Sequence, residues 1–467
     1  MSSGTRPDPG LESAKKIGFV PCLAFAVGAM VGGGVFTLSG EAINQAGPAA
    51  LVSYAIAGLV MLVSALAFVA VAARAEVGDS GYGPIAGLLG RPWRFVVMWG
   101  FYLNALFLVA FLADSFGSYL HDYFLHDVGA TAAGIVCIVA LVLLNLGPAA
   151  LVGRAETWVV GIKIGLLCVF IGWGLAAFSG THFQPFNPDG TQSVIATSAL
   201  LFTAYTGFNV VTNMAPAVRD PGRTVPRAVI GAVLIAITIY LLVVVAMLDS
   251  GITHFGPSGV SEAADVLMGH WGGQLIAFAA CLSTLSGANA MILGGSEIAL
   301  RLVVQGDVPE VVGRRTAGGF PWMSVGLVGV VALGLVLFSG LNTVVAMSNV
   351  VALIAMIVVN AACVVLARRG WPGTGFRLPG GPAIPVVAGV ACAIQFASFD
   401  LRDIGWGLLA MLFGLLLYAV RHRGVVAEGL IDEITEAFER LETPLARAMR
   451  AKFHRREPGG PVEQGST

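Results

Sequence analysis

The stretch that decides the fold is "GAMVGGGVF", residues 28–36, which lies inside a long apolar segment. It contains Gly28, Gly32, Gly33 and Gly34, and Gly40 follows shortly after. A glycine inside a helix costs about 1 kcal/mol relative to alanine. An apolar helix weakened at its middle predicts a break that faces protein or a cavity. The alternative is close packing of two helices through Gly28-x-x-x-Gly32.

The composition around this stretch is that of a membrane protein. The chain has 467 residues, of which 57% are hydrophobic and 11% are charged. A helix that spans a bilayer needs about 20 mostly apolar residues. Twelve such stretches are found at 17–43, 48–72, 95–120, 130–146, 156–178, 193–218, 227–248, 271–303, 323–339, 341–366, 383–399 and 404–420. We therefore expect an all-α polytopic membrane protein with twelve transmembrane helices.

The positive charges predict the orientation of these helices. If the N-terminus is cytoplasmic, all but two of the 26 lysines and arginines fall in cytoplasmic loops and tails. The exceptions are Arg402, which is outside, and Lys163, which lies in a span. Cytoplasmic loops retain positive charge, so we expect a cell-membrane protein with both termini in the cytoplasm. No basic patch indicates nucleic acid as a partner.

The domain organisation follows from these spans. We expect a cytoplasmic N-terminal tail at 1–14, a transporter domain at 15–420 and a cytoplasmic C-terminal tail at 421–467. Within the C-terminal tail, apolar residues recur at helical spacing. This pattern predicts an amphipathic helix at about 425–452, which lies on the membrane or on the inner face of the protein.

A second break signal occurs in "LLFTAYTGFNVVTNMAPAVRDPGRTVPRAV", residues 200–229, where Gly207 is surrounded by threonines and asparagines. Interrupted spans at corresponding positions of two halves point to a transporter site between inverted repeats. We place these repeats at about 17–178 and 193–366, with extra helices at 383–420. The N-terminal end of a half-helix attracts anions, so such a site suits a carboxylate.

Lys163 is the third unusual feature. It lies eight residues into a span that begins near Ala155, which is about 12 Å along a helix axis. An ionisable group at such depth is a functional hypothesis by default. Burial favours the neutral form of an amine, so Lys163 is a candidate for proton exchange. The alternative is a lysine that snorkels to the cytoplasmic interface.

Four segments in this order resemble the amino acid–polyamine–organocation (APC) superfamily of permeases. They are "GAMVGGGVF", "VGRAETWVVGIKIGLL", "GFNVVTNMAPAVRDPGRTVPRA" and "STLSGANAMILGGSEIALRLVVQGDVPE". The resemblance covers about residues 15–420. It implies a LeuT-type 5+5 inverted repeat with helices 1 and 6 broken and two further helices. The second segment is similar to proton-coupled members, which carry a lysine where sodium-coupled relatives hold a sodium ion.

The resemblance also implies roles for individual residues. The substrate carboxylate would meet backbone N–H groups of Gly33 and Gly34, and its amino group would meet carbonyls on both broken helices, under a lid formed by Phe202. The implied substrate site consists of Met30, Gly32, Gly33, Gly34, Phe202, Thr203, Tyr205 and Gly207. The Lys163 ammonium would support the bend of helix 1, in a proton-coupling group with Gly28, Val31, Ser283 and Ser286.

We therefore expect a secondary active transporter of amino acids or related amines, acting by proton-coupled symport through alternating access. The alternative is an amino acid or amine exchanger without net proton coupling. No catalytic constellation, metal-ligand spacing or phosphate-binding loop is present in the sequence, so we expect neither an enzyme nor a cofactor. The expected partners are the substrate, protons and the lipid bilayer.

Overall fold

A computed structural model describes residues 17–75, 81–146, 152–208, 212, 215, 218–316, 319–338, 340–371 and 376–422. The predicted N-terminal tail at 1–14 and the amphipathic helix predicted at 425–452 lie outside these residues. The chain divides into two compact units, Met1–Leu415 and Leu416–Thr467. All features below belong to the first unit.

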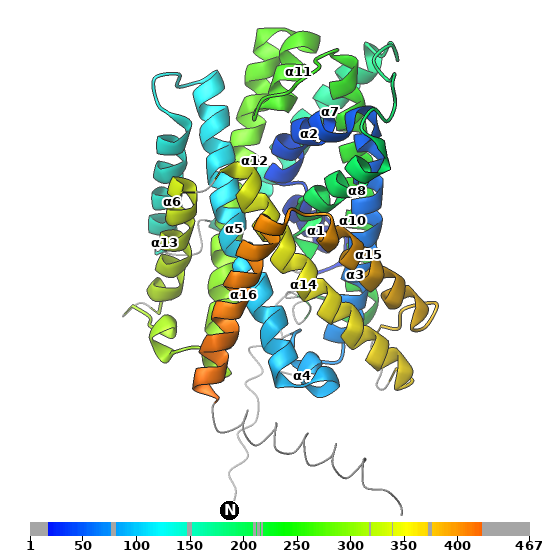
Figure 1. Ribbon diagram of the computed structural model, residues 1–467. Helices are drawn as coiled ribbons and strands as arrows, with labels where there is room; N and C mark the ends of the chain where they lie inside the picture. The colour runs from blue at the N-terminus through cyan, green and yellow to red at the C-terminus, as the bar shows by residue number, and fades with distance from the viewer. Residues whose placement is uncertain are drawn as a thin grey trace, which may run out of the picture. The chain divides into compact units, whose positions relative to one another are not determined.

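The described residues are almost entirely helical (Figure 1). The larger helices are α1 (Phe19–Met30), α2 (Gly33–Ala46), α3 (Ala50–Ala72), α5 (Arg91–Tyr123), α6 (Ala130–Asn145), α7 (Val152–Ala176), α8 (Gly190–Leu200), α10 (Pro221–Asp249), α12 (His270–Val304), α13 (Trp322–Phe338), α14 (Leu341–Arg368), α15 (Ala383–Ala397) and α16 (Leu401–Arg421). Seven helical segments in this part of the chain are long and apolar enough to cross a membrane, and shorter apolar helices accompany them. The protein is therefore a helical, multi-pass membrane protein.

Helices occur in all twelve stretches that the sequence marks as apolar, although several of their ends differ. The helix predicted from 95 begins at Arg91, because Pro92 occupies its first turn, where a missing N–H costs nothing. Two short helices, α4 (Gly83–Leu89) and α11 (Gly259–Met268), were not expected. Each is too short to appear as an apolar span. The number of spans and the inverted repeat stay predictions.

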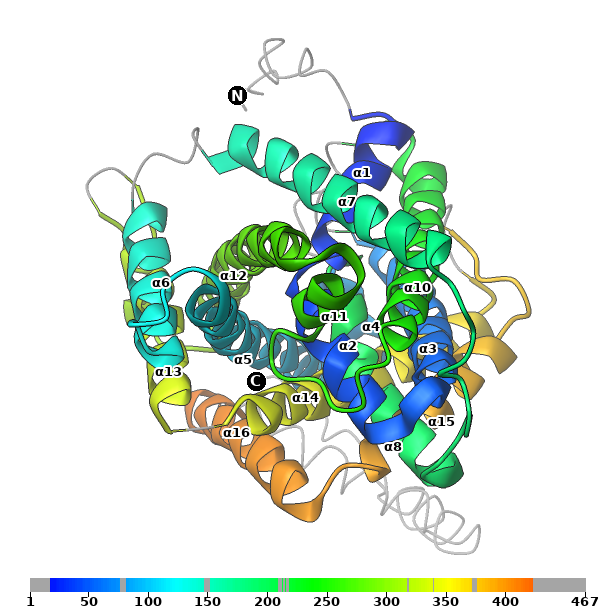
Figure 2. The same ribbon diagram turned by 90° about the horizontal axis from the view of Figure 1, so that it is seen from above.

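α5 is the central helix of the first unit. Its 33 residues extend for about 50 Å, and every residue of its most apolar window is buried, against 28% for α7. It packs along α12, α14 and α6, and Figure 2 shows α5 and α12 together, with α6 and α13 beside them. The buried apolar window of α5 gives neighbouring helices a fixed surface to pack against.

The two interrupted segments lie close together beside this centre. α1 packs along α10, and α2 contacts both α8 and the 3-10 helix η4 (Leu201–Tyr205) that follows it. At the far end of α1, Ile17 forms a parallel bridge with Val218, and the N–H of Arg219 donates to the Ile17 carbonyl at 2.9 Å. The contact of α2 with η4 therefore brings the first interrupted segment, near residue 30, beside the second, near residue 205.

Candidate functional site

The first break separates α1 from α2. α1 ends at Met30, Gly32 has extended backbone angles (φ −102°, ψ −156°), and α2 begins at Gly33. Among the described residues, no side chain caps the start of α2. Because the first N–H groups of a helix have no partner within it, this end presents donors and the positive end of the helix dipole. The break therefore leaves backbone N–H donors at a helix end inside an apolar protein.

The second break follows α8. The helix tightens into η4, Thr206 is extended (ψ 154°), and Gly207 has a φ of +121°. Such a φ is readily adopted only by glycine. The chain therefore leaves the helix at Thr206 and Gly207, as the sequence predicts for this position. The neighbouring Asn209, Asn213 and Pro216 lie outside the described residues.

Two glycines hold the breaks face to face. A Cβ atom at Gly207 would lie 2.9 Å from the carbonyl carbon and oxygen of Ala29, and a Cβ atom at Gly34 would lie 2.9 Å from the Cα of Ala204. Contacts this short with backbone atoms cannot be relieved by turning a side chain. Only glycine fits at either position, and each glycine belongs to one break and packs against the other.

A tyrosine that we did not single out in the sequence joins the same two segments. The hydroxyl of Tyr240, on α10, lies 2.7 Å from the Met30 carbonyl oxygen and 2.9 Å from that of Ala204. Its ring packs against the rings of Tyr54 and Tyr205, with centroids 5.5 and 5.0 Å away. The carbonyls that the breaks release are thus partly satisfied by one buried side chain.

Replacing Tyr240 by phenylalanine should destabilise the protein by about 1 kcal/mol, because two buried carbonyls lose their shared donor. Tyr82 provides a matched control. It is also buried, and its hydroxyl has no hydrogen-bond partner among the described residues. The thermal denaturation midpoint of the purified Tyr240→Phe protein should fall, and that of Tyr82→Phe should not. Equal midpoints would show that the Tyr240 bonds contribute nothing.

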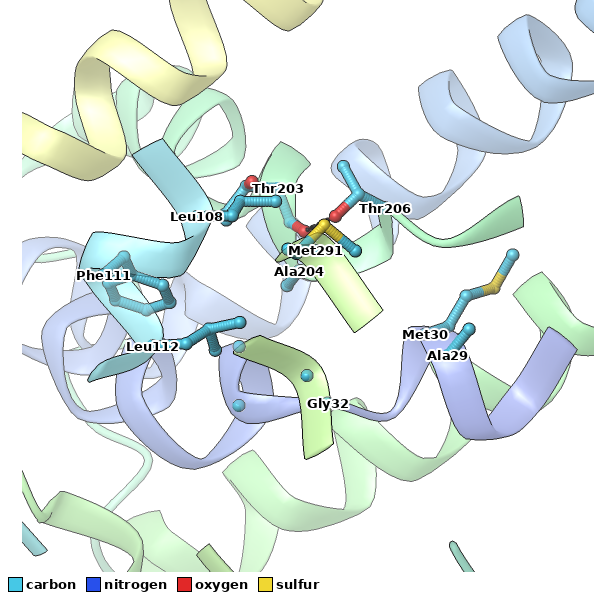
Figure 3. A pocket seen from close by; sticks show the side chains of 13 residues that line it. Ala29, Met30, Gly32, Leu108, Phe111, Leu112, Thr203, Ala204, Thr206 and Met291 are labelled. Carbon is cyan, nitrogen blue, oxygen red and sulfur yellow. Dashed lines mark hydrogen bonds between the residues drawn. The ribbon is translucent and has the colours of Figure 1, made fainter. Parts of the chain in front are cut away.

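A small cavity of about 30 Å³ lies between the breaks, α5 and α12 (Figure 3). It measures about 370 Å³ when all the empty space around it, including open solvent, is counted. It is lined by Ala29, Met30, Gly32, Gly33, Gly34, Leu108, Phe111, Leu112, Thr203, Ala204, Thr206, Gly287 and Met291. Five residues of the substrate site expected from the sequence are among them, namely Met30, Gly32, Gly33, Gly34 and Thr203. Phe202, Tyr205 and Gly207 do not line it. Phe202 is fully buried, and Tyr205 donates its hydroxyl to the Tyr54 carbonyl at 2.9 Å.

The polar groups of the cavity differ in how fully they are used. The Met30 carbonyl accepts from the N–H of Gly32 at 2.7 Å in addition to Tyr240, and the Thr203 carbonyl accepts from both the N–H and the hydroxyl of Thr206. Both lone pairs of these two carbonyls are therefore engaged. The Thr203 hydroxyl is buried and has no hydrogen-bond partner among the described residues. Among the described side chains that line the cavity, it is the polar group without such a partner.

Lys163 extends from α7 to the last turn of α1, next to the first break. Its ammonium nitrogen lies 2.8 Å from the Gly28 carbonyl oxygen, and the residue is 1% exposed. The close approach of α7 to α1 depends on Gly28, because a Cβ there would lie 2.7 Å from a methyl of Val160. A lysine that contacts the backbone in this way does not reach the membrane surface, so the snorkelling alternative does not describe its conformation here.

The other members of the expected proton-coupling group are buried near these helices. Val31 follows the last turn of α1, and Ser283 and Ser286 lie on α12. The Ser283 hydroxyl has no hydrogen-bond partner within the described part of the chain. Asn104 of α5 donates to the Ser348 hydroxyl at 2.8 Å and joins α5 to α14.

Comparison with known proteins places this arrangement in a family. A family model described as "Amino acid permease" matches residues 17–417. The chain belongs to the amino acid permease family. It is 25% identical to the branched-chain amino acid permease BcaP of Bacillus subtilis over 89% of this chain and 94% of that protein. It is 24% identical to BcaP of Lactococcus lactis, over 85% and 92% of the two chains, and 24% identical to the methylthioribose transporter of B. subtilis, over 81% and 87%. This permease is thus a membrane transporter by family, and transporters rather than enzymes are its relatives.

Proposed function

We propose that this permease carries amino acids or related amines across the cell membrane by proton-coupled symport. The observation that carries the proposal is the cavity between two broken helices, which the first residues of α2 help to line. Two of the relatives are named for branched-chain amino acids, which agrees with a substrate that has both a carboxylate and an ammonium group.

The substrate carboxylate binds at the start of α2. The N–H groups of Gly33 and Gly34 have no intrahelical acceptor, and both glycines line the cavity. A carboxylate there gains charge-assisted hydrogen bonds and the favourable end of the helix dipole. The absence of side chains at these glycines lets the carboxylate approach the backbone directly.

The substrate ammonium faces the second break. The Thr203 hydroxyl is an unused acceptor, and the Thr203 and Met30 carbonyls become available if Thr206 and Tyr240 turn away. Phe202 and Tyr205 are buried residues of η4 that do not line the cavity. In this conformation they stabilise η4 by packing and do not contact the substrate. Gly207 acts by letting the two breaks meet.

Lys163 couples transport to protons. When its amine is protonated, it donates a charge-assisted hydrogen bond to the Gly28 carbonyl oxygen, 2.8 Å away, and holds the bend of the first broken helix. When the amine loses its proton, that charge-assisted bond is weakened and α1 is free to move against α7. Alternating access then proceeds by movement of the broken segments against α5 and α12. In this proposal the chain crosses the membrane twelve times, its inverted repeats are residues 17–178 and 193–366, and both termini are in the cytoplasm.

One experiment separates symport from exchange. The purified permease is reconstituted into liposomes without internal amino acid, and an inward proton gradient is imposed. Accumulation of external L-leucine against its gradient is the expected result. Uptake that occurs only when the liposomes are loaded with an amino acid, regardless of the proton gradient, would identify an exchanger. No uptake of any amino acid or amine, loaded or empty, would refute the proposed function.

Uptake should not depend on sodium. The Lys163 ammonium occupies the Gly28 carbonyl at 2.8 Å, and a sodium ion could not share that carbonyl with a positive charge. Replacing external sodium by choline should therefore leave the initial rate of uptake unchanged within about two-fold. A rate that rises steeply with sodium concentration at constant ionic strength would show that a cation site exists elsewhere.

A further inference from the structure

The wall of the cavity formed by α5 and α12 is entirely apolar. It consists of Leu108, Phe111, Leu112, Gly287 and Met291. Figure 3 shows the Leu108 side chain extending toward Thr203 and the Leu112 side chain toward Gly32. None of the described residues that line the cavity has an ionisable side chain. A charged substrate side chain would therefore lose its hydration without gaining a partner.

Leu112 is the member of this wall that lies against the carboxylate end of the cavity. A Cβ atom at Gly33 would collide with its Cδ2 atom, and a Cβ atom at Gly287 would lie 3.1 Å from its Cδ1 atom. The side chain therefore fills the gap between these two glycines, one on α2 and one on α12. A ligand whose carboxylate is bound by Gly33 and Gly34 must direct its own side chain past the Leu112 methyl groups.

We infer that the site selects amino acids with uncharged, apolar side chains, and that Leu112 sets the upper limit on their size. The inference rests on the proposed function, because it takes the carboxylate to bind at the start of α2. An apolar side chain gains from burial against this wall, while a charged one pays for desolvation that nothing offsets. Phe111 and Met291 provide the remaining contact surface.

The test measures dissociation constants for the purified full chain with L-valine, L-phenylalanine, L-lysine and L-glutamate, by ligand-dependent thermal stabilisation. L-Valine should bind at least about ten-fold more tightly than L-lysine or L-glutamate. Leu112→Ala should raise the affinity for L-phenylalanine relative to that for L-valine by about ten-fold or more. This is the size of effect expected when a hydrophobic pocket changes by a few methylene groups.

Leu106→Ala is the matched control. Leu106 is also buried on α5, at 2% exposed, but it does not line the cavity. It should lower stability without changing the ratio of the two dissociation constants. Leu112→Phe is the opposite change, and it should retain binding of L-alanine while weakening that of L-leucine.

The outcomes are distinguishable from failure of the proposed function. Tight binding of L-lysine or L-glutamate by the wild-type protein would overturn the selectivity inference and leave amino acid transport intact. An unchanged preference in Leu112→Ala, with the protein folded, would remove Leu112 as the residue that limits size. If the wild-type protein bound none of the amino acids, both the proposed function and this inference would fall.

Discussion

Substitution of Gly34 by leucine is expected to lower substrate affinity at least about 100-fold while the protein still inserts into the membrane. The first atom of the new side chain would lie 2.9 Å from the Cα of Ala204, so the two breaks must move apart. The rest of the side chain would cover the N–H groups at the start of α2, where the carboxylate is proposed to bind. The helices on either side keep their lipid-facing surfaces, which is why insertion should survive.

The measurement is amino acid binding and uptake, with membrane insertion checked by expression level and size-exclusion profile. Gly165→Leu on α7 is the control, because Gly165 is exposed and a Cβ atom there has no neighbour within 4 Å. It should bind substrate as the wild-type protein does. Normal uptake by Gly34→Leu would contradict the assignment of the first break as the carboxylate site.

Replacement of Lys163 by alanine should abolish accumulation driven by a proton gradient while leaving substrate binding measurable. The substitution removes the titrating amine and its bond to the Gly28 carbonyl, but it leaves the donors of Gly33 and Gly34 in place. If the pKa of this amine differs by one unit between two orientations of the carrier, the free energy of coupling is about 1.36 kcal/mol. Without the amine, this coupling is lost, and the variant should at most exchange one substrate molecule for another.

Accumulation of L-leucine in empty liposomes under an inward proton gradient, followed by counterflow in loaded liposomes, measures the two activities separately. Ile162→Ala, next to Lys163 but 42% exposed, serves as the control and should accumulate substrate normally. If Lys163→Ala liposomes concentrated substrate as well as the wild-type protein, the proton would have to travel through another group and Lys163 would have only a structural role.

The features that can be predicted from the sequence are residues that are unfavourable in an apolar membrane helix. Glycines inside an apolar span and a lysine at the depth of Lys163 are each unfavourable in a membrane helix, so their presence needs a reason. The break at Gly32, the break at Gly207 and the approach of Lys163 to α1 are all visible in the structure at the positions where these residues indicate them.

Features that agree with their surroundings cannot be recognised in this way. Tyr240 lies in an aliphatic helix, and Leu112 is one leucine among many, so neither differs from a core residue until the helices are packed. The contact of Gly34 with Ala204 joins residues far apart in the chain, and no local pattern encodes it. The short helices α4 and α11 were missed because a hydropathy window is longer than either of them.

The first break has a consequence for genetics. If the groups that recognise the carboxylate are the main-chain amides of Gly33 and Gly34, only a change to proline deletes them, because every other amino acid supplies the same N–H. Alanine at either position would add a methyl group and crowd its neighbours, but it would not remove the N–H group that binds the carboxylate. The contribution of each amide can be measured only by atomic replacement, such as an ester in place of the peptide bond at residue 34, made by semisynthesis or nonsense suppression with a hydroxy acid. Residues that contact the substrate side chain, by contrast, are free to vary, so substrate choice can drift in this protein while the recognition of the amino acid main chain stays the same.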